Sequence, residues 1–289
     1  MMKTFLIPVD FSENTLPTCK RAIYLTGQQK AKLFLFHIYP DQIIVPDSSL
    51  PVGIDNDAFL NVEFIATLRK QAKENMLNLI TEIEALIKTM GYANIEVSHL
   101  VTGGDPEWEI RSICEEINPN LIVMGTEGEG KKGGLEGSMA ENIMNRAKIP
   151  VIAVPVSFQK EQLQHIMYAT NFSNMDIASI NKVFSLLEKM KVIVHVVHFQ
   201  FNDKDEKSTI LMNELEQAFD KEKLLGKITF SLIHASNKTD MLDAFTKKFQ
   251  IDMVAFLSHK RNFFQNLFSH KISKKDFFKL GLPMLALHE

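Results

Sequence analysis

The stretch that best indicates the fold runs from residue 121 to residue 138, as LIVMG followed by TEGEGKKGGLEGS. Residues 121–125 form an uninterrupted apolar run, which is typical of a strand covered on both faces. The glycine-rich residues that follow lead into 138–147, where apolar positions recur every three or four residues and predict a helix. A buried strand, a loop and a helix in this order form the repeating unit of a parallel α/β sheet.

The same alternation runs through the first 157 residues. Short apolar runs predict strands at 4–9, 33–39, 95–101, 121–125 and 151–155. Amphipathic spacing predicts helices at 16–27, 62–90, 108–117 and 138–147. Asp105-Pro106-Glu107 marks one helix start, with an N-cap, a proline at the first helical position and an acid in the first turn.

The second half of the chain repeats this scheme. It has predicted strands at 165–170, 191–198, 228–234, 253–257 and 284–287, and predicted helices at 175–189, 208–225, 239–249 and 269–279. Residues 9–12 (VDFS) match 170–173 (TNFS) at an offset of 161, and 149–153 (IPVIA) match 282–286 (LPMLA) at an offset of 133. We therefore predict an α/β fold of two tandem doubly wound domains, 1–157 and 163–289, each an open five-stranded parallel sheet with helices on both faces.

The composition excludes several classes of protein. Hydrophobic residues make up 45% of the 289 residues and charged residues 23%, as in ordinary globular chains. A net charge of −3 gives no basic surface for nucleic acid or an anionic membrane, and no apolar run approaches the roughly 18–20 residues of a membrane span. Two cysteines, Cys19 and Cys114, are too few for a disulfide framework. We expect a cytoplasmic protein that binds neither nucleic acid nor membrane.

The glycine-rich loop is the best candidate for a binding site. Glycine has no Cβ, so backbone N–H groups can approach a phosphate, and a helix N-terminus behind them favours an anion. Ser138 would add a hydroxyl donor. The loop is neither a P-loop nor the dinucleotide-binding fingerprint, because it follows the fourth strand and lacks Gly-Lys-Ser/Thr. The alternative is a surface loop whose glycines serve flexibility alone.

Asp10 is the second candidate, at the carboxyl end of the first strand. Ligands of open α/β sheets bind outside the carboxyl ends of the strands, where the strand order reverses. If the first and fourth strands are neighbours, Asp10 and the glycine-rich loop face the same crevice. A carboxylate there can accept hydrogen bonds from a ribose hydroxyl or an adenine amine. The alternative is an N-cap for the following helix, which is a frequent role of Asp.

These features together resemble a tandem universal stress protein. The resemblance rests on residues 8–12 (PVDFS), 36–38 (FHI) and 104–106 (GDP), and above all on the Gly125-x2-Gly128…Gly137-Ser138 pattern followed by 149–151 (IPV). It implies a Rossmann-like fold with the first strand beside the fourth, and a site that holds ATP with Mg²⁺. The implied ligand-binding residues are Val9, Asp10, Ile38, Met124, Gly125, Gly128, Gly137, Ser138 and Met139. One departure is that eight residues separate Gly128 from Gly137, where the family usually has nine.

The second half lacks the counterparts of this motif. At the offset of 161, Asp10 becomes Asn171, and at the offset of 133 the motif residues become Ser258, Arg261, His270 and Lys271. We therefore expect one ATP per chain, in the first domain. His195 and His198 lie three apart in a predicted strand and point to opposite faces, so no metal site is predicted. Satisfied or solvent-facing histidines are the simpler interpretation.

The expected function is that of a non-enzymatic, ATP-binding regulator of the stress response. A nucleotide-free scaffold or pairing module is the first alternative, and a slow ATPase or self-phosphorylating switch is the second. No catalytic residue is assigned, because no nucleophile–base pattern is present. The resemblance also implies that 151–154 and 284–287 pair as fifth strands inside one chain, forming an internal pseudo-dimer, and it leaves room for a homodimer of whole chains.

Overall fold

The computed structural model describes residues 2–27, 29–41, 54–126, 139–158, 160–200, 206–234, 238–258 and 280–288. The N-terminal half (residues 2–158) contains β1 (Lys3–Pro8), α1 (Thr15–Leu25), β2 (Ala31–Tyr39), α2 (Ile54–Thr89), β3 (Ile95–Gly103), α3 (Pro106–Ile117), β4 (Leu121–Gly125), α4 (Met139–Arg146) and β5 (Val151–Val154). The C-terminal half (residues 160–288) contains β6 (His165–Ala169), α5 (Asp176–Leu186), β7 (Ile193–Gln200), α6 (Glu206–Gln217), α7 (Asp220–Leu224), β8 (Ile228–His234), α8 (Lys238–Lys248), β9 (Met253–Leu257) and β10 (Met284–Leu287).

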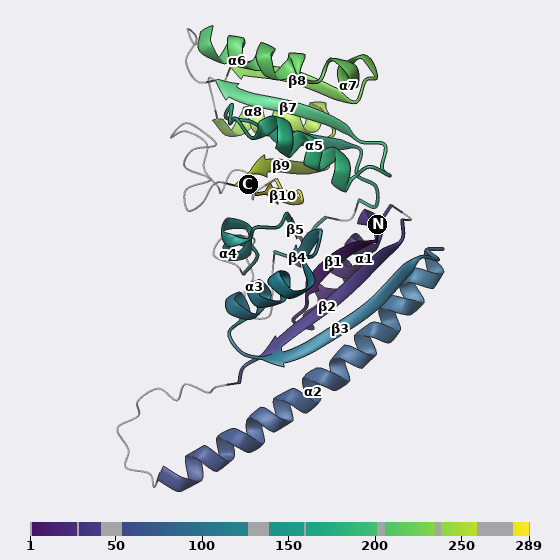
Figure 1. Ribbon diagram of the computed structural model, residues 1–289, viewed down its shortest axis with the longest axis vertical. Coiled ribbons are helices and arrows are strands. Elements are labelled where there is room, and N and C mark those ends of the chain that lie inside the picture. Colours follow the sequence, from purple (N-terminus) through teal and green to yellow (C-terminus); the bar gives the residue numbers. More distant parts are fainter. Residues whose placement is uncertain are drawn as a thin grey trace.

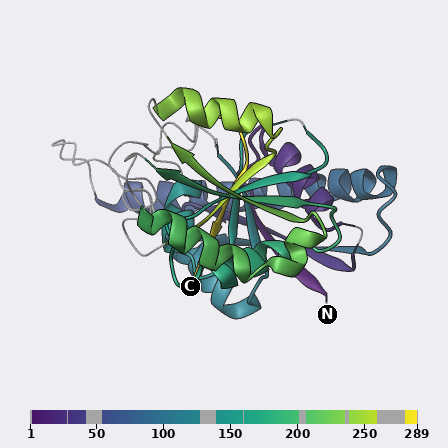
Figure 2. The same cartoon turned by 90° about the horizontal axis from the view of Figure 1, so that it is seen from above.

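The described strands form one sheet in the order β3-β2-β1-β4-β5-β10-β9-β6-β7-β8. Within each half, the neighbouring strands are parallel. Seen from above, the strands fan out by their cumulative twist and helices lie on both sides of them (Figure 2). The predicted α/β, doubly wound fold is confirmed, and β1 lies between β2 and β4 as the crevice argument requires.

The two halves join through their short last strands (Figure 1). β10 pairs antiparallel with β5, and Leu285 stands opposite Ile152. Both strands are wholly buried. The pairing expected between 151–154 and 284–287 is therefore present, and neither strand is left as an open sheet edge.

Polar contacts reinforce this junction on the α1 side. Lys3 of β1 donates its Nζ to the Ser185 carbonyl at 2.7 Å and lies 3.3 Å from the Glu188 carboxylate, both in or just after α5. Arg21 of α1, only 6% exposed, donates to the Glu161 carbonyl at 3.0 Å and lies 4.7 Å from the ring centre of Phe158. The segment that connects the halves is thus held by α1.

Two predicted helices differ clearly from the structure, and a third is not tested by it. α2 begins at Ile54 instead of residue 62, because Asp and Asn at 55–57 are poor helix formers and end the apolar periodicity in the sequence. In Figure 1 this helix extends past the end of β3. The helix predicted at 208–225 is interrupted at Phe219, which is 2% exposed and non-helical, so that α6 and α7 are separate. The helix predicted at 269–279 lies outside the described residues.

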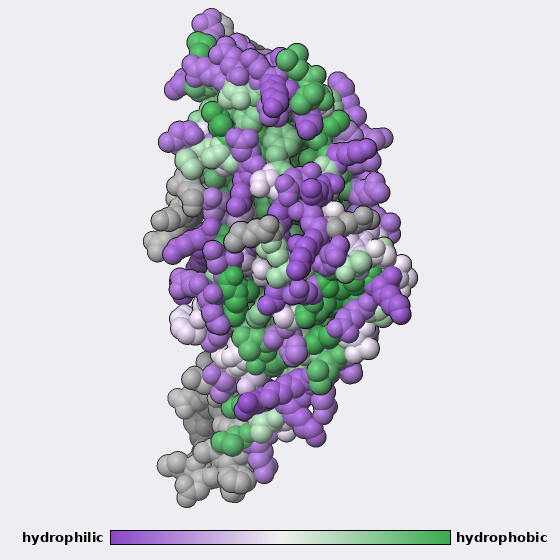
Figure 3. Space-filling model, turned by 45° about the vertical axis from the view of Figure 1, so that its right-hand side comes forward, coloured by the Kyte–Doolittle hydropathy of each residue, from purple (hydrophilic) through white to green (hydrophobic). Residues whose placement is uncertain are grey.

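The surface is mixed in polarity. On the face drawn in Figure 3, apolar residues lie in patches separated by hydrophilic side chains. Exposed large apolar residues include Val62, Phe64 and Leu77 of α2 and Trp108 of α3. Among the described residues, no helix is long and apolar enough to span a membrane.

His195 is buried between β6, β7 and α8, and it contacts the partly exposed His165. His195 is 4% exposed; its Nε2 lies 3.1 Å from His165 Nδ1 and its Nδ1 lies 2.8 Å from Thr229 Oγ1. The rings of Phe245 and Phe249 cover it. Both ring nitrogens therefore have partners, as expected of a satisfied core histidine. Burial, and then the charge of His165, lower the pKa of His195 to about 4.

We predict that acid destabilises the fold through His195. Because its pKa is about 4 in the folded chain and about 6.5 in the unfolded chain, the unfolded state takes up the proton first as the pH falls. The free energy of unfolding should fall by about 3 kcal/mol between pH 6.5 and pH 4 on this account. Urea unfolding at several pH values measures it. In the His195→Gln variant, the free energy of unfolding should fall less between pH 6.5 and pH 4. In His99→Gln, at an exposed residue of β3, the full fall should remain. Equal falls in the two variants would contradict the assignment to His195.

We also predict that the junction makes the two halves unfold together. Ile152 is 1% exposed, so Ile152→Lys would bury an unpaired charge and should cost about 3–5 kcal/mol. Val62→Lys, at a residue 65% exposed on α2, is the matched control and should cost under about 0.5 kcal/mol. Far-UV circular dichroism and the fluorescence of Trp108, the only tryptophan, follow urea unfolding. Unchanged, independent melting of each half in the Ile152→Lys variant would refute the junction.

Candidate functional site

The candidate site lies at the carboxyl ends of β1, β2 and β4. β1 has β2 on one side and β4 on the other, so the residues that follow β1 stand beside the end of β4. Of the predicted ligand-binding residues, the structure brings five to this edge: Val9, Asp10, Ile38, Met124 and Gly125. Met139 begins α4 and is 36% exposed. Gly128, Gly137 and Ser138 lie outside the described residues.

Several residues at these strand ends are buried, and Val9 and Met124 among them are apolar. Val9 is 7% exposed and donates its N–H to the Phe36 carbonyl at 2.8 Å, which extends the β1–β2 ladder by one residue. Met124 is 5% exposed. Thr126, which sequence analysis did not single out, is also 5% exposed and donates its N–H to the Val154 carbonyl at 3.1 Å. The end of β4 is thereby fixed against β5 at the residue where the glycine-rich sequence begins.

The Asp10 carboxylate organises the loop between β1 and α1. Its Oδ1 accepts hydrogen bonds from the Ser12 N–H at 3.1 Å, the Ser12 hydroxyl at 2.7 Å and the Thr15 hydroxyl at 3.1 Å. Asp10 is not the N-cap of α1, since Asn14 holds that position, although its side chain makes no capping hydrogen bond. Three donors on one oxygen fix the direction of the carboxyl group.

A second constraint beside Asp10 comes from Phe11 and His37. Phe11 has a φ of 60°, a left-handed conformation that a bulky side chain rarely adopts. Its ring lies 4.3 Å from the His37 ring, centre to centre. His37 Nδ1 is 2.8 Å from the Val9 carbonyl, which can only accept, so Nδ1 carries the proton. This packing holds the chain at the sharp turn that follows β1.

The C-terminal half contains the same turn. Phe172 has a φ of 59°, its ring lies 4.4 Å from that of His198, and His198 Nδ1 donates to the Thr170 carbonyl at 2.8 Å. Each of these residues follows its N-terminal counterpart at the offset of 161. Sequence analysis used Phe172 as part of the repeat but gave the two histidines no role in it. The sequence did contain a signal for this repeated turn, because a His follows each VDFS-like motif at the same sequence separation.

The carboxylate occupies different positions in the two turns. Asp10 and Thr15 of the N-terminal half correspond to Asn171 and Asp176 of the C-terminal half. Asp176 is 2% exposed, whereas Asp10 is partly exposed. The donors to Asp176 are the Tyr168 hydroxyl at 2.7 Å, the Ser173 N–H at 3.0 Å and the Thr170 hydroxyl. The acid of the C-terminal half is thus buried in the core.

The strand register corrects one alignment made from the sequence. The offset of 133 placed Ser258 at the position of Gly125. In the sheet, Ser258 donates its N–H to the Leu287 carbonyl as Thr126 does to Val154, so Ser258 matches Thr126 and the offset at this strand is 132. Leu257, 3% exposed, then occupies the position of Gly125. A large side chain fills the place where the N-terminal half has no Cβ.

No metal centre accompanies the site in the described part of the chain, where no group of three or more His, Cys, Asp or Glu side chains is arranged to hold an ion. The two cysteines are free thiols; burial raises the pKa of both to about 12, with the charge of Glu115 adding to the effect at Cys114. Neither is an activated nucleophile.

Comparisons with known proteins find similarity to several universal stress proteins. Universal stress protein MJ0577 of Methanocaldococcus jannaschii is 27% identical over 157 residues, which cover 53% of this chain and 95% of that protein. The crystal structure of a universal stress protein from Archaeoglobus fulgidus superposes over 99% of this chain and 96% of its own with a TM-score of 0.67; at 16% identity it shows the shared fold alone. A universal stress protein solved in complex with cAMP is 23% identical and covers 53% of this chain and 96% of its own, with a TM-score of 0.35.

The family profile gives the assignment. The profile of the universal stress protein family matches residues 1–155, more than half of the chain. This chain therefore belongs to the universal stress protein family.

Proposed function

We propose that the chain is a non-enzymatic regulator of the stress response that binds one ATP with Mg²⁺ in a first domain, residues 1–157. The observation that carries the proposal is the adjacency of β1 and β4, which puts the Asp10 carboxylate and Gly125 at one sheet edge. A topological switch point of this kind is where open α/β sheets bind ligands. Family membership and the glycine-rich sequence after β4 point in the same direction.

The residues at this edge suit an adenine nucleotide. Val9, Ile38 and Met124 offer apolar surface for a purine ring, and Asp10 offers a carboxylate oxygen for a ribose hydroxyl or a base amine. Gly125, Gly128, Gly137 and Ser138 would hold the phosphates through backbone N–H groups and one hydroxyl. Mg²⁺, held mainly by phosphate oxygens and water, would reduce the repulsion between the phosphates and Glu127 and Glu129.

The second domain, residues 163–289, serves in this proposal as the pairing partner and does not bind ATP. Asn171 replaces the carboxylate of Asp10, and Leu257 replaces Gly125. The acid that this half does possess, Asp176, is buried and bonded to its own turn. Its β10 closes the edge of β5, which leaves the chain as an internal pseudo-dimer that can still associate with a second chain.

The regulatory role follows from what the site contains. It brings together groups that bind and orient a nucleotide, and no residue of the site is assigned to hydrolysis. Protein partners would instead read the surface that nucleotide binding alters. The cytoplasm is the location we propose, since its reducing conditions keep thiols such as Cys19 and Cys114 free.

We predict one ATP per chain by isothermal titration calorimetry with Mg²⁺. Gly137→Val should abolish binding, because a branched side chain would intrude where phosphate oxygens approach the backbone. Asp10→Ala should weaken the preference for ATP over inorganic triphosphate by about tenfold, the value of one charge-assisted hydrogen bond. Two equivalent sites, or ATP binding that survives Gly137→Val, would contradict the proposal. Absence of ATP binding would favour the scaffold.

A matched variant separates the two roles of Asp10. Thr15→Val removes one donor from Asp10 Oδ1 and leaves the carboxylate in place. If Asp10 contacts the nucleoside, Thr15→Val should keep most of the preference for ATP that Asp10→Ala loses. Equal losses in the two variants would assign Asp10 to the loop alone.

A further inference from the structure

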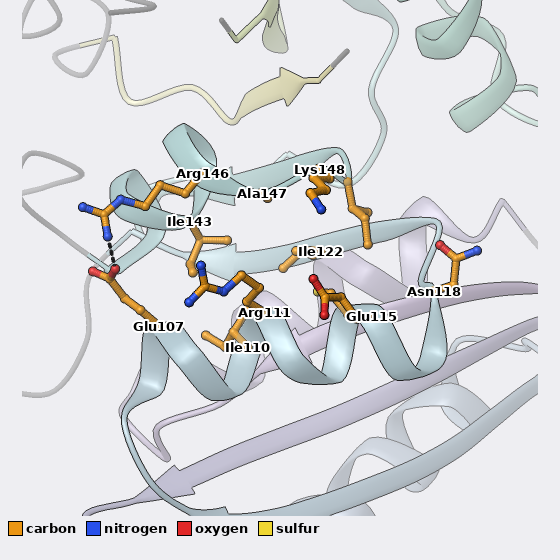
Figure 4. Close-up of a pocket in the computed structure, with 12 residues that line it drawn as sticks. Glu107, Ile110, Arg111, Glu115, Asn118, Ile122, Ile143, Arg146, Ala147 and Lys148 are labelled. Atoms are coloured by element: carbon orange, nitrogen blue, oxygen red, sulfur yellow. Dashed lines mark hydrogen bonds and ion pairs between the residues drawn. The ribbon is translucent and has the colours of Figure 1, made fainter. Parts of the chain in front are cut away.

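A pocket between α3 and α4 has no part in the proposed nucleotide site. It has a volume of about 270 Å³ and is floored by the apolar side chains of Ile110, Cys114, Ile122, Ile143 and Ile149. Figure 4 shows α3 along one wall, α4 along the other, and β4 behind them. The pocket lies over the face of the sheet, whereas Asp10 lies at the carboxyl end of β1.

The pocket extends past the C-terminal end of α4, since Ala147, Lys148 and Ile149 line it. α3 has 12 residues and α4 has 8, so α4 is shorter by about 6 Å at 1.5 Å per residue. After Arg146 the chain returns to β5 through 147–150, and Lys148 and Ile149 of this segment line the pocket together with Cys114 and Glu115 of α3. Ala147, the first residue of this return, is too small to fill the gap. The apolar side chains of Cys114, Ala147 and Ile149 therefore stay partly exposed in the pocket, above the buried Ile122.

The rim of the pocket is charged, and its charges are not balanced. Glu107 is engaged twice, by the Arg146 guanidinium and by the Asn142 amide, the latter at 2.8 Å. Among the described residues, Arg111 and Lys148 have no hydrogen-bond or ion-pair partner. In Figure 4 the guanidinium of Arg111 and the ammonium of Lys148 reach in from opposite walls. Glu115 is the one remaining acid among the residues that line the pocket.

This combination defines a class of ligand. Partly exposed apolar side chains favour a hydrocarbon body. The rim carries three cations (Arg111, Arg146 and Lys148) and two acids (Glu107 and Glu115), so it favours one further negative charge. The volume lies just below the roughly 300–1,000 Å³ of pockets for drug-sized molecules, so the ligand is small. We propose that the α3–α4 pocket binds a small amphipathic monocarboxylate, with the carboxylate between Arg111 and Lys148 and the hydrocarbon on Cys114, Ala147 and Ile149.

Octanoate is the probe for this proposal, and Cys114 reports where it binds. The Cys114 thiol lines the pocket and is partly exposed, while the only other thiol, Cys19, is fully buried. Octanoate should bind the full-length chain with a Kd of about 0.1–1 mM and slow the reaction of Cys114 with a maleimide, read by mass spectrometry. The neutral analogue 1-octanol should bind at least about tenfold more weakly.

Substitutions of Arg111 and Lys148 test the role of the two cations in binding. Arg111→Gln combined with Lys148→Gln changes exposed side chains only and should weaken octanoate binding about tenfold or more. Arg69→Gln, on the exposed side of α2, is the matched control and should leave the Kd unchanged. Asp10→Ala should also leave it unchanged, which separates this pocket from the nucleotide crevice.

Three results would overturn the proposal. The first is that octanoate does not slow the reaction of Cys114 with the maleimide. The second is that the Kd for octanoate is unchanged in the Arg111→Gln, Lys148→Gln chain. The third is that 1-octanol binds as tightly as octanoate. If Asp10→Ala loses octanoate binding while the Arg111→Gln, Lys148→Gln chain keeps it, octanoate binds at the proposed nucleotide site, and the proposal is likewise overturned.

Discussion

The antiparallel pairing of β5 with β10 is the constraint on which the rest of the structure depends. Each strand has only four residues and is fully buried, so neither could stand as an exposed edge without a partner. Their pairing turns two five-stranded parallel sheets into one sheet of ten described strands. Lys3 and Arg21 then fasten the N-terminal half to α5 and to the connecting segment.

The turn that follows the first strand of each half has the same backbone in both halves but a different role in each. Both halves keep a left-handed Phe packed on a His that donates to a strand-end carbonyl. The difference is the place of the acid. At Asp10 it is partly exposed at a switch point; at Asp176 it is buried beneath Tyr168 and bonded within the core. The same backbone therefore supports a candidate binding site in one half and a closed structural turn in the other.

The sequence predicted the strands well because buried parallel strands are continuous apolar runs, as in 121–125 and 253–257. It also placed Asp10, Ile38 and Gly125 at one edge. It misjudged details that depend on neighbours: the one-residue shift that matches Leu257 with Gly125 follows from hydrogen-bond register, and the break at Phe219 follows from burial. The α3–α4 pocket depends on where α4 ends, a boundary that apolar spacing alone does not fix.

The central claim is that two like halves share one sheet and only the first offers a nucleotide site. A crystal structure of the full chain grown with Mg²⁺ and a non-hydrolysable ATP analogue tests it most directly. The account predicts one analogue per chain, at the carboxyl ends of β1 and β4, with its ribose or base within hydrogen-bond distance of Asp10. An analogue bound at the ends of β6 and β9, or none at the β1–β4 edge at saturating concentration, would contradict it.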